Sequence, residues 1–262
     1  MKSIKVIVAT HKKYQMPKDE LYLPLHVGAY DKDDLGYTKD STKDNISKKN
    51  PYFCELTGLY WAYKNLDNDY IGLFHYRRYL TLSDRIPKDK DEKFKCVLKY
   101  NEAESLLKET DIILPKKRKY YIENLYDHYK HTMYVEPLDE TRKIIEKKYS
   151  KYLNEFDKLK VRRSAHMFNM FIMKKDILDD YCEFLFGVLF ELEKRMKDVK
   201  YDSFHSRFYG RISELLLDVY LNTNNLSYKE INFMDMDNIN WFKKGTSFLK
   251  AKFFHKKYDK SF

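Results

Sequence analysis

Residues 70–80, with the sequence YIGLFHYRRYL, are the stretch that decides the fold class of this chain. Residues 70–74 form an apolar run typical of a buried strand, and the chain then turns polar at His75, Arg77 and Arg78. Ionised groups are desolvated only when they are paired, so two guanidiniums at a buried strand end need an anion. That anion is either a carboxylate of the protein or a phosphate of a ligand, because the planar arginine fork grips two oxygens at once.

Strands and helices alternate on both sides of this stretch. Residues 4–9 are a β-branched run of the kind found in buried parallel strands. Residues 52–65 repeat apolar side chains at helical spacing, with Asn50 placed as a cap and Pro51 at the helix start. Further strands are predicted at residues 111–115 and 167–173, and further helices at residues 101–109, 138–149, 152–159, 175–196 and 211–221. This alternation predicts an α/β fold, a central and mostly parallel sheet flanked by helices.

Length and composition are those of a globular protein. The chain has 262 residues, of which 43% are hydrophobic, enough for one large α/β domain. No stretch approaches about 20 apolar residues, the length of a membrane-spanning helix, and the first residues are typical of a strand rather than a secretory signal. Cys54, Cys96 and Cys182 are widely spaced, which predicts neither a disulfide framework nor a zinc cluster and fits a reducing cytoplasm.

The charge balance points to an anionic partner. A formal net charge of +10 favours nucleic acid, an anionic membrane surface or a phosphate-bearing substrate. We expect a main domain over residues 1–225 and a basic, aromatic extension over residues 226–262. Within it, residues 241–258 interleave aromatic and lysine side chains, which suits the headgroup region of an anionic bilayer. The alternative is a helix that packs on the domain with a solvated lysine face.

Several common catalytic motifs are missing from the sequence. It contains no P-loop, no glycine-rich dinucleotide fingerprint, no Gly-x-Ser-x-Gly elbow and no His-Glu-x-x-His helix. His128 and His131 lie three residues apart beside Asp127, a spacing that places two imidazoles on one helix face. A metal site there lacks a third ligand of matching spacing, so contact with a substrate is the favoured interpretation.

Three ordered motifs carry a resemblance to a known family. They are residues 44–79, which include CELTGLYWA and YIGLFHYRRY; residues 169–186, which include NMFIM and YCEFLF; and residues 207–217, RFYGRISELLL. In these the chain resembles a bacterial capsular- and exopolysaccharide-synthesis family, catalogued as domain of unknown function 4422 and now placed among glycosyltransferases. The resemblance runs from about residue 4 to residue 222.

The resemblance implies sugar transfer from a nucleotide-activated donor. The implied donor is UDP-galactose, in pyranose or furanose form. The implied acceptor is a growing surface glycan that is linked to a lipid. The implied scaffold is GT-A-like, a fold in which a central strand commonly ends in an Asp-x-Asp metal motif. Here that strand ends in His75, Tyr76, Arg77 and Arg78, while residues 67–69 (Asp-Asn-Asp) precede the strand and are interpreted as a turn. A divalent metal, Mn or Mg, therefore stays an open question.

Catalytic roles follow from the charge that develops during transfer. Breaking the sugar–phosphate bond leaves a diphosphate, which Arg77 and Arg78 are expected to stabilise. A regular strand would point these two side chains to opposite faces, so neither is preferred. By resemblance, Glu214 is the base that deprotonates the acceptor hydroxyl, with Asp202 and Glu55 as alternatives.

The remaining site predictions concern binding. Thr10, His11 and Lys12 close the first strand and are expected at the uracil and ribose. The other expected donor contacts are Gly28, Asn45, Ser47, His75 and Asn169, and the expected acceptor contacts are His128 and His131. No residue is assigned to a metal.

Two other classes of function compete with this hypothesis. A nucleic-acid-binding protein would use the positive charge and the aromatic surface, but no known module is present and the basic residues are dispersed among 40 acids. A non-catalytic subunit that binds nucleotide sugars would be expected to lose charge at Arg77, Arg78 or Glu214, and all three are retained. The expected location is the cytoplasm, peripheral on the inner face of the plasma membrane, without nucleic acid as a partner.

Overall fold

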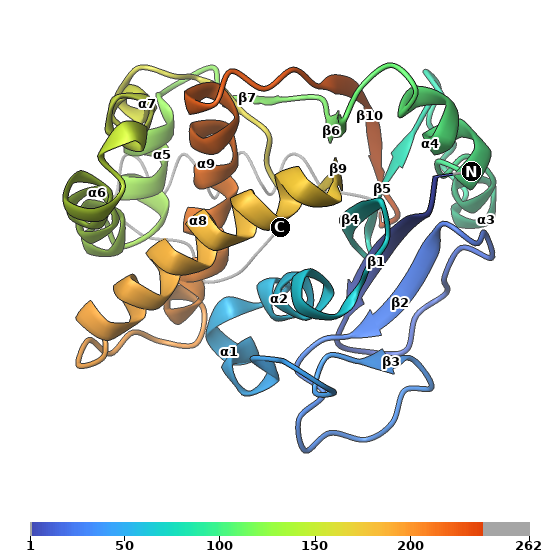
Figure 1. Ribbon diagram of the computed structural model, residues 1–262, viewed down its shortest axis with the longest axis horizontal. Coiled ribbons are helices and arrows are strands. Elements are labelled where there is room, and N and C mark those ends of the chain that lie inside the picture. The colour runs from blue at the N-terminus through green and yellow to red at the C-terminus, as the bar shows by residue number, and fades with distance from the viewer. Residues whose placement is uncertain (1, 238–262) are drawn as a thin grey trace.

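A computed structural model describes residues 2–237, which fold around one eight-stranded sheet (Figure 1). The strands lie in the order β3 (Thr38–Lys39), β2 (Tyr22–His26), β1 (Ile4–Thr10), β4 (Tyr70–His75), β5 (Arg78–Thr81), β10 (Lys229–Asp235), β6 (Ile112–Pro115) and β9 (Phe171–Lys174). Strand β9 also pairs with β4. The predicted α/β class with a central sheet and flanking helices is therefore confirmed.

The sheet is mixed rather than mostly parallel. Strand β1 runs parallel to β2 and β4, and β6 runs parallel to β10. Strands β9 and β5 are antiparallel to their neighbours. Strand β9 pairs with β4 and with β6, and β5 turns back from β4 in a hairpin. The ends of β1 and β4 nevertheless meet at one edge, since Ala9 is paired with His75.

Two hydrophobic cores cover the two faces of the sheet. In β1, Ile7 and Ala9 belong to one core, whereas Val6 and Val8 belong to the other. This follows from the alternation of side chains along a strand that is buried on both faces. The first core contains side chains of helices α2 (Leu56–Asn65), α8 (Lys175–Arg195) and α9 (Phe208–Thr223), and the second contains side chains of residues 94–107.

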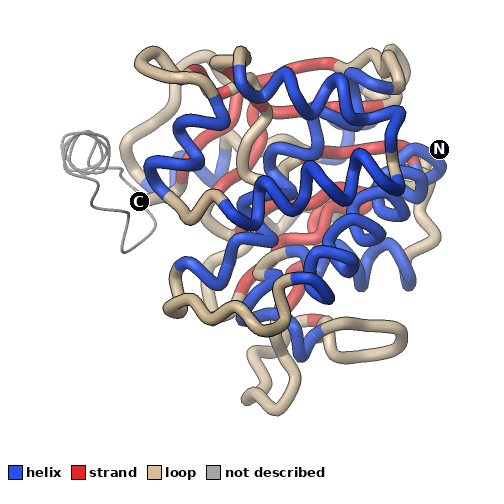
Figure 2. Tube along the Cα trace, turned by 90° about the vertical axis from the view of Figure 1, so that its left-hand side faces the viewer, coloured by secondary structure: helices blue, strands red, loops and turns tan. Residues whose placement is uncertain are grey.

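The helices gather mainly on one side of the sheet, as Figures 1 and 2 show from two directions. Their bounds are α3 (Lys90–Lys95), α4 (Tyr100–Leu106), α5 (Leu125–Thr132), α6 (Glu136–Lys148), α7 (Leu153–Asp157), α8 (Lys175–Arg195) and α9 (Phe208–Thr223). A separate two-stranded ladder pairs β7 (Arg118–Lys119) with β8 (Ser164–Ala165). Within residues 2–237, no helix has the length and apolar character needed to cross a membrane.

The helix predicted over residues 52–65 is broken into α1 (Asn50–Phe53) and α2 (Leu56–Asn65). The break lies at Cys54, whose φ of 54° and ψ of −131° end the first helix. Pro51 lies in the first turn of α1 as predicted, but Asn50 is not the cap. Its side-chain amide instead donates a hydrogen bond of 2.8 Å to the carbonyl of Cys54, which supports the break.

Strand β10 lies beyond residue 225, the predicted end of the main domain. It pairs with β5 on one side and with β6 on the other. Residues 229–235 therefore belong to the sheet rather than to an extension. The basic and aromatic segment over residues 241–258 lies outside the described residues.

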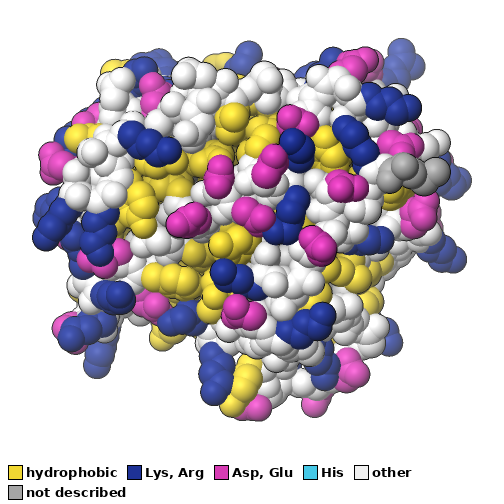
Figure 3. All heavy atoms as spheres, viewed as in Figure 1, with side chains coloured by type: hydrophobic (Ala, Val, Ile, Leu, Met, Phe, Trp, Pro, Cys, Tyr) yellow, Lys and Arg dark blue, Asp and Glu magenta, His cyan; other side chains and the backbone are white. Residues whose placement is uncertain are grey.

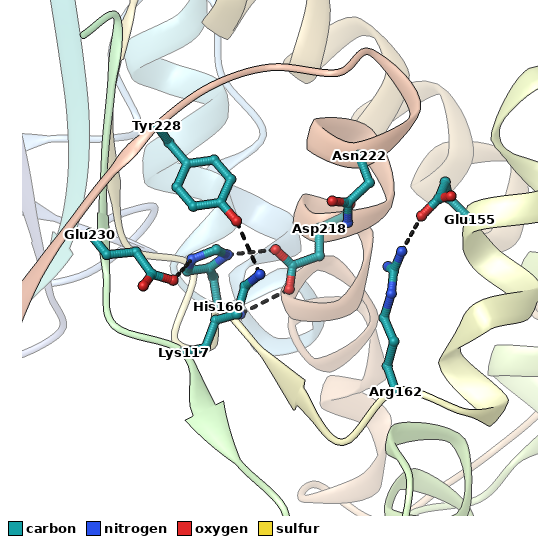
Figure 4. Close-up of polar contacts among 8 residues, drawn as sticks. All are labelled: Lys117, Glu155, Arg162, His166, Asp218, Asn222, Tyr228 and Glu230. Carbon is teal, nitrogen blue, oxygen red and sulfur yellow. Dashed lines mark hydrogen bonds and ion pairs between the residues drawn. The ribbon is translucent and has the colours of Figure 1, made fainter. Parts of the chain in front are cut away.

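A hydrogen-bonded network around a buried histidine ties this last strand to the helices (Figure 4). His166 is fully buried, and its Nδ1 lies 2.5 Å from Asp218 Oδ1 while its Nε2 lies 2.8 Å from Glu230 Oε1. Burial alone would raise the pKa of Asp218, but the hydrogen bonds from His166 outweigh it and lower that pKa. Nearby, Lys117 Nζ donates a hydrogen bond of 3.0 Å to the hydroxyl of Tyr228. These contacts hold β10 and α9 in place around the site described next.

Candidate active site

A cavity of about 170 Å³ opens where β4 ends, between the β4–β5 hairpin, α5 and the start of α9. Five arginines and two glutamates line it: Arg77, Arg78, Arg118, Arg207, Arg211, Glu55 and Glu214. The fold brings together Arg77, Arg78 and Glu214, the three residues predicted to be catalytic. The excess of guanidinium over carboxylate makes the cavity suited to an anion.

The two arginines of the hairpin differ in their partners. Arg78 Nε donates a hydrogen bond of 2.7 Å to Asp235 Oδ1, and the guanidinium lies 4.2 Å from the ring centroid of Phe168. Arg77 Nε is buried and has no hydrogen-bond partner among residues 2–237. The protein's own carboxylate therefore holds Arg78, whereas Arg77 Nε has no acceptor among residues 2–237 and is a donor left unsatisfied by them.

His75 supplies a neutral imidazole to the same wall of the cavity. Burial, followed by the nearby charges of Arg77 and Arg78, holds the pKa of His75 well below its ordinary value. Its Nδ1 accepts a hydrogen bond of 3.3 Å from the backbone N–H of Arg77, so the proton is assigned to Nε2. His75 therefore presents one N–H donor and adds no charge.

Glu214 lies in the second turn of α9 rather than at the helix start, because α9 begins at Phe208. Its side chain is buried, and Oε1 accepts a hydrogen bond of 3.2 Å from the backbone N–H of Phe168. Burial raises the pKa of Glu214, against the smaller opposing effect of Arg211, and the charge of Glu55 adds to the rise. Glu214 is thus a carboxyl that holds its proton more strongly than an exposed glutamate does.

Asn169 does not line the cavity but holds Glu55, which does. Its side-chain amide donates hydrogen bonds to Glu55 Oε1 at 2.7 Å and to the carbonyl of Gly210 at 3.2 Å. Its Oδ1 accepts one of 2.8 Å from Ser213. The strand predicted over residues 167–173 begins only at Phe171. Asn169 therefore lies in the loop before it, with a φ of 52°. The structure therefore gives Asn169 the task of positioning a carboxylate, and a contact with the donor sugar stays a prediction.

Arg207 and Arg211 were quoted in the third sequence motif but given no role there. Arg207 ends the short 3-10 helix His205–Arg207 just before α9, and Arg211 lies in the first turn of α9, so their spacing of four residues was the available signal. Arg207 Nε donates a hydrogen bond of 2.9 Å to Cys54 Sγ. Burial raises the pKa of Cys54 to about 11, so this thiol is neutral and serves as the acceptor that orients Arg207.

The predicted acceptor contacts lie on α5, where one carboxylate holds both. His128 Nδ1 and His131 Nδ1 lie 3.1 Å and 2.8 Å from the two oxygens of Glu123. His128 lines the cavity, and burial lowers its pKa, whereas His131 is not among the lining residues. Only His128 is therefore placed to touch a molecule inside.

The predicted nucleotide contacts at the end of β1 lie beside the cavity rather than in it. Thr10 is fully buried, and its hydroxyl donates a hydrogen bond of 2.6 Å to the carbonyl of Lys12. The ring of His11 lies 5.6 Å from that of Tyr76, and Lys12 Nζ lies 5.4 Å from the same ring. Burial, followed by the charges of Lys12 and Arg77, lowers the pKa of His11, so His11 lies near the hairpin, and its contact with a nucleotide stays a prediction.

Gly28, Asn45 and Ser47 surround a buried carboxylate outside the cavity. Asp40 accepts hydrogen bonds from the Gly28 N–H at 2.8 Å, the Ser47 hydroxyl at 2.5 Å and the Thr57 hydroxyl at 2.6 Å. Asn45 Oδ1 in turn accepts one from the Ser47 N–H at 3.2 Å. Gly28 has a φ of 67°, a conformation that glycine adopts without strain. Local structure thus accounts for these three residues, and their donor contacts stay predictions.

Replacing Asp40 by alanine is expected to lower the free energy of unfolding by about 2–4 kcal/mol, because buried donors lose their acceptor. Urea denaturation measures this loss. The exposed Asp33→Ala is the matched control and should leave the midpoint within about 0.5 kcal/mol of the wild type. An unchanged midpoint for Asp40→Ala would contradict the structural role.

The end of β4 does not fit a divalent metal ion. Its side chains are an imidazole and two guanidiniums, and guanidiniums repel a cation. Asp69 lies at the opposite end of β4, where its Oδ2 accepts hydrogen bonds of 2.7 Å and 3.0 Å from Ser3, so this carboxylate is held away from the cavity. In the described part of the chain, no three His, Cys, Asp or Glu side chains are grouped so that they could hold a metal.

Comparison with known proteins places these features in a family. Residues 5–225 match the profile of a family described as "Domain of unknown function (DUF4422)". A solved structure described as "WbbM bifunctional glycosytransferase apo structure" is similar, with a TM-score of 0.82 and 31% sequence identity. The similarity covers 90% of this chain and 46% of that one, so the chain spans less than half the length of its solved relative. Among curated proteins, none matches the chain.

Proposed function

The chain belongs to the DUF4422 family, and from this membership and the cavity we propose that it is a glycosyltransferase that uses a nucleotide-activated sugar. The similarity to a solved glycosyltransferase supports the class of reaction. One observation carries the proposal: five arginines line a cavity in which Arg77 holds a buried donor without a partner among residues 2–237.

The arginines act on the leaving group. As the sugar–phosphate bond breaks, its electron pair passes to the diphosphate, and preorganised donors stabilise the growing charge. A phosphate oxygen would satisfy Arg77 Nε, and charge-assisted bonds of this kind are among the stronger hydrogen bonds. Arg78 is fixed by Asp235, so it contributes positive charge from a constant position. The neutral His75 adds an N–H donor beside them.

Glu214 acts as the base on the acceptor. It removes the proton of the acceptor hydroxyl while that oxygen forms a bond to the anomeric carbon of the sugar. A carboxyl with a raised pKa suits this task near neutral pH, since a base works best with a pKa close to the operating pH. Glu55 is the alternative within the cavity. Asp202 does not line it and accepts hydrogen bonds from the backbone of Phe204 and His205 instead.

The finer parts of the proposal come from the sequence resemblance. The donor is UDP-galactose in pyranose or furanose form, with uracil and ribose toward Thr10, His11 and Lys12. The acceptor is a lipid-linked glycan of capsular or exopolysaccharide biosynthesis, and His128, which lines the cavity, contacts it. The scaffold is of the GT-A-like type, and the protein works at the cytoplasmic face of the membrane.

Thermal-shift measurements with UDP, GDP and nucleotide sugars test the proposal directly. We expect UDP to raise the melting temperature in the presence of EDTA. At a hundredfold excess of UDP over Kd, the free energy of unfolding should rise by about 2.7 kcal/mol. Added manganese should not be required, because the proposal assigns the charge of the diphosphate to the arginines of the cavity. A lack of response to any nucleotide, or a response only with manganese, would contradict the arginine–diphosphate arrangement.

The nucleic-acid alternative finds little support on the face shown in Figure 3. Acidic and basic side chains are interspersed there over α8 and α2, without a continuous positive area. Proteins that track phosphates present a basic groove with aromatic platforms. A single-stranded oligonucleotide that displaced UDP at physiological salt would favour this alternative.

A further inference from the structure

An exposed apolar tip lies beside the cavity, at the top of Figure 1 between β7 and α5. It consists of Tyr121, Ile122 and Val161, residues that are 81%, 53% and 74% exposed. Large apolar side chains at such exposure are costly in water when they lie together, and clusters of them mark interaction sites.

Two backbone contacts bring the parts of the apolar tip together. The N–H of Tyr120 donates a hydrogen bond of 2.7 Å to the carbonyl of Arg163, and the N–H of Leu125 donates one of 2.9 Å to that of Arg162. Residues 121–124 therefore project as a loop alongside residues 161–163. The β7–β8 ladder continues this pairing and anchors the base of the loop.

Positive charge surrounds the apolar tip. Lys119, Lys160 and Arg163 are exposed next to it in the chain. The nearby acids already have partners, which are His128 and His131 for Glu123, Arg162 for Glu155 and Arg142 for Asp157. Aromatic and aliphatic side chains ringed by Lys and Arg match the interface of an anionic bilayer, where apolar groups enter the headgroup region and cations meet lipid phosphates.

We infer that the apolar tip is a docking site for the surface of an anionic lipid bilayer. The elements that carry it also line the cavity, through Arg118, Tyr120, Leu125 and His128. Docking would thus bring the cavity to a lipid-linked acceptor. That benefit rests on the proposed function, whereas the membrane contact itself does not.

Co-sedimentation of the full chain with vesicles tests this inference. The vesicles contain phosphatidylglycerol and phosphatidylethanolamine, with pure phosphatidylcholine for comparison. The triple variant Tyr121→Ser, Ile122→Ser, Val161→Ser should partition about tenfold or more weakly, because three partly inserted side chains are lost. Ile86→Ser with Val199→Ser, which removes two exposed apolar side chains elsewhere, is the matched control and should bind as the wild type does.

A second variant addresses the charges. Lys119→Glu, Lys160→Glu, Arg163→Glu should remove most of the salt-sensitive binding to phosphatidylglycerol vesicles. Both variants should keep the thermal shift with UDP, which separates this inference from the proposed function. Wild-type binding to no vesicle, or equal binding by the triple variant, would overturn it. So would a wild-type dimer that the triple variant lacks, because the tip would then contact a second copy.

Discussion

Glu214→Gln is expected to lower turnover by about 10²–10⁴-fold while UDP binding stays intact. Glutamine keeps the shape and accepts the hydrogen bond from the Phe168 N–H, but it cannot take a proton from the acceptor. Turnover is measured as UDP release with an acceptor present, and binding as the thermal shift with UDP.

The same variant should make the protein more stable near neutral pH. Burial raises the pKa of Glu214 in the folded state, so the wild type loses stability as the pH rises from the unfolded pKa through the folded one. Glutamine carries no charge and avoids this loss. Melting temperatures should therefore be higher for Glu214→Gln at pH 7 and equal to the wild type below about pH 4.

Two results would contradict this picture. Unchanged turnover would remove Glu214 from the mechanism and leave Glu55, the other carboxylate of the cavity, as the base. A lower stability of Glu214→Gln at pH 7 would show that the ionised carboxylate has a favourable partner. Glu55→Gln should be measured in parallel, because residues 168–169 hold both carboxylates. The Asn169 amide donates a hydrogen bond to Glu55, and the Phe168 N–H donates one to Glu214.

Arg77→Met is expected to abolish most of the UDP-induced thermal shift and to lower kcat/KM by about 10²–10³-fold, because a preorganised donor at the leaving group is lost. The stability of the free protein should not fall, since Arg77 Nε has no hydrogen-bond partner among residues 2–237. Arg77→Lys keeps the charge but loses the planar fork, so it should recover only part of the activity.

Arg78→Met provides the matched comparison. Its guanidinium is paired with Asp235, so its removal leaves a half-buried carboxylate without its partner and should lower the melting temperature. The exposed Arg85→Met should change neither stability nor UDP binding. If Arg77→Met destabilised the free protein as much as Arg78→Met did, the two arginines would share a structural role and the leaving-group assignment would fail.

Local patterns carried the sequence predictions that the structure confirms. The apolar run of residues 70–74 and the β-branched run of residues 4–9 became neighbouring strands of the central sheet. Helices α8 and α9 lie where apolar spacing predicted them, within a few residues. Burial of an apolar face is a property of consecutive residues, so the sequence reveals it directly.

Errors arose where a distant segment changed a local pattern. The helix over residues 52–65 is broken at Cys54, whose thiol accepts a hydrogen bond from Arg207. The sheet is mixed because β9 and β10 return to it from far along the chain. Periodicity within one segment carries no information about such returns.

By itself the sequence determined the alternation of strands and helices, and it placed His75 and two arginines where a buried strand ends. Only the tertiary structure decided which arginine is available, because Asp235 lies 157 residues from Arg78 along the chain. It also decided that Asn169 holds Glu55 across 114 residues. Secondary structure follows from neighbours in the chain, whereas the pairing of charges depends on neighbours in space.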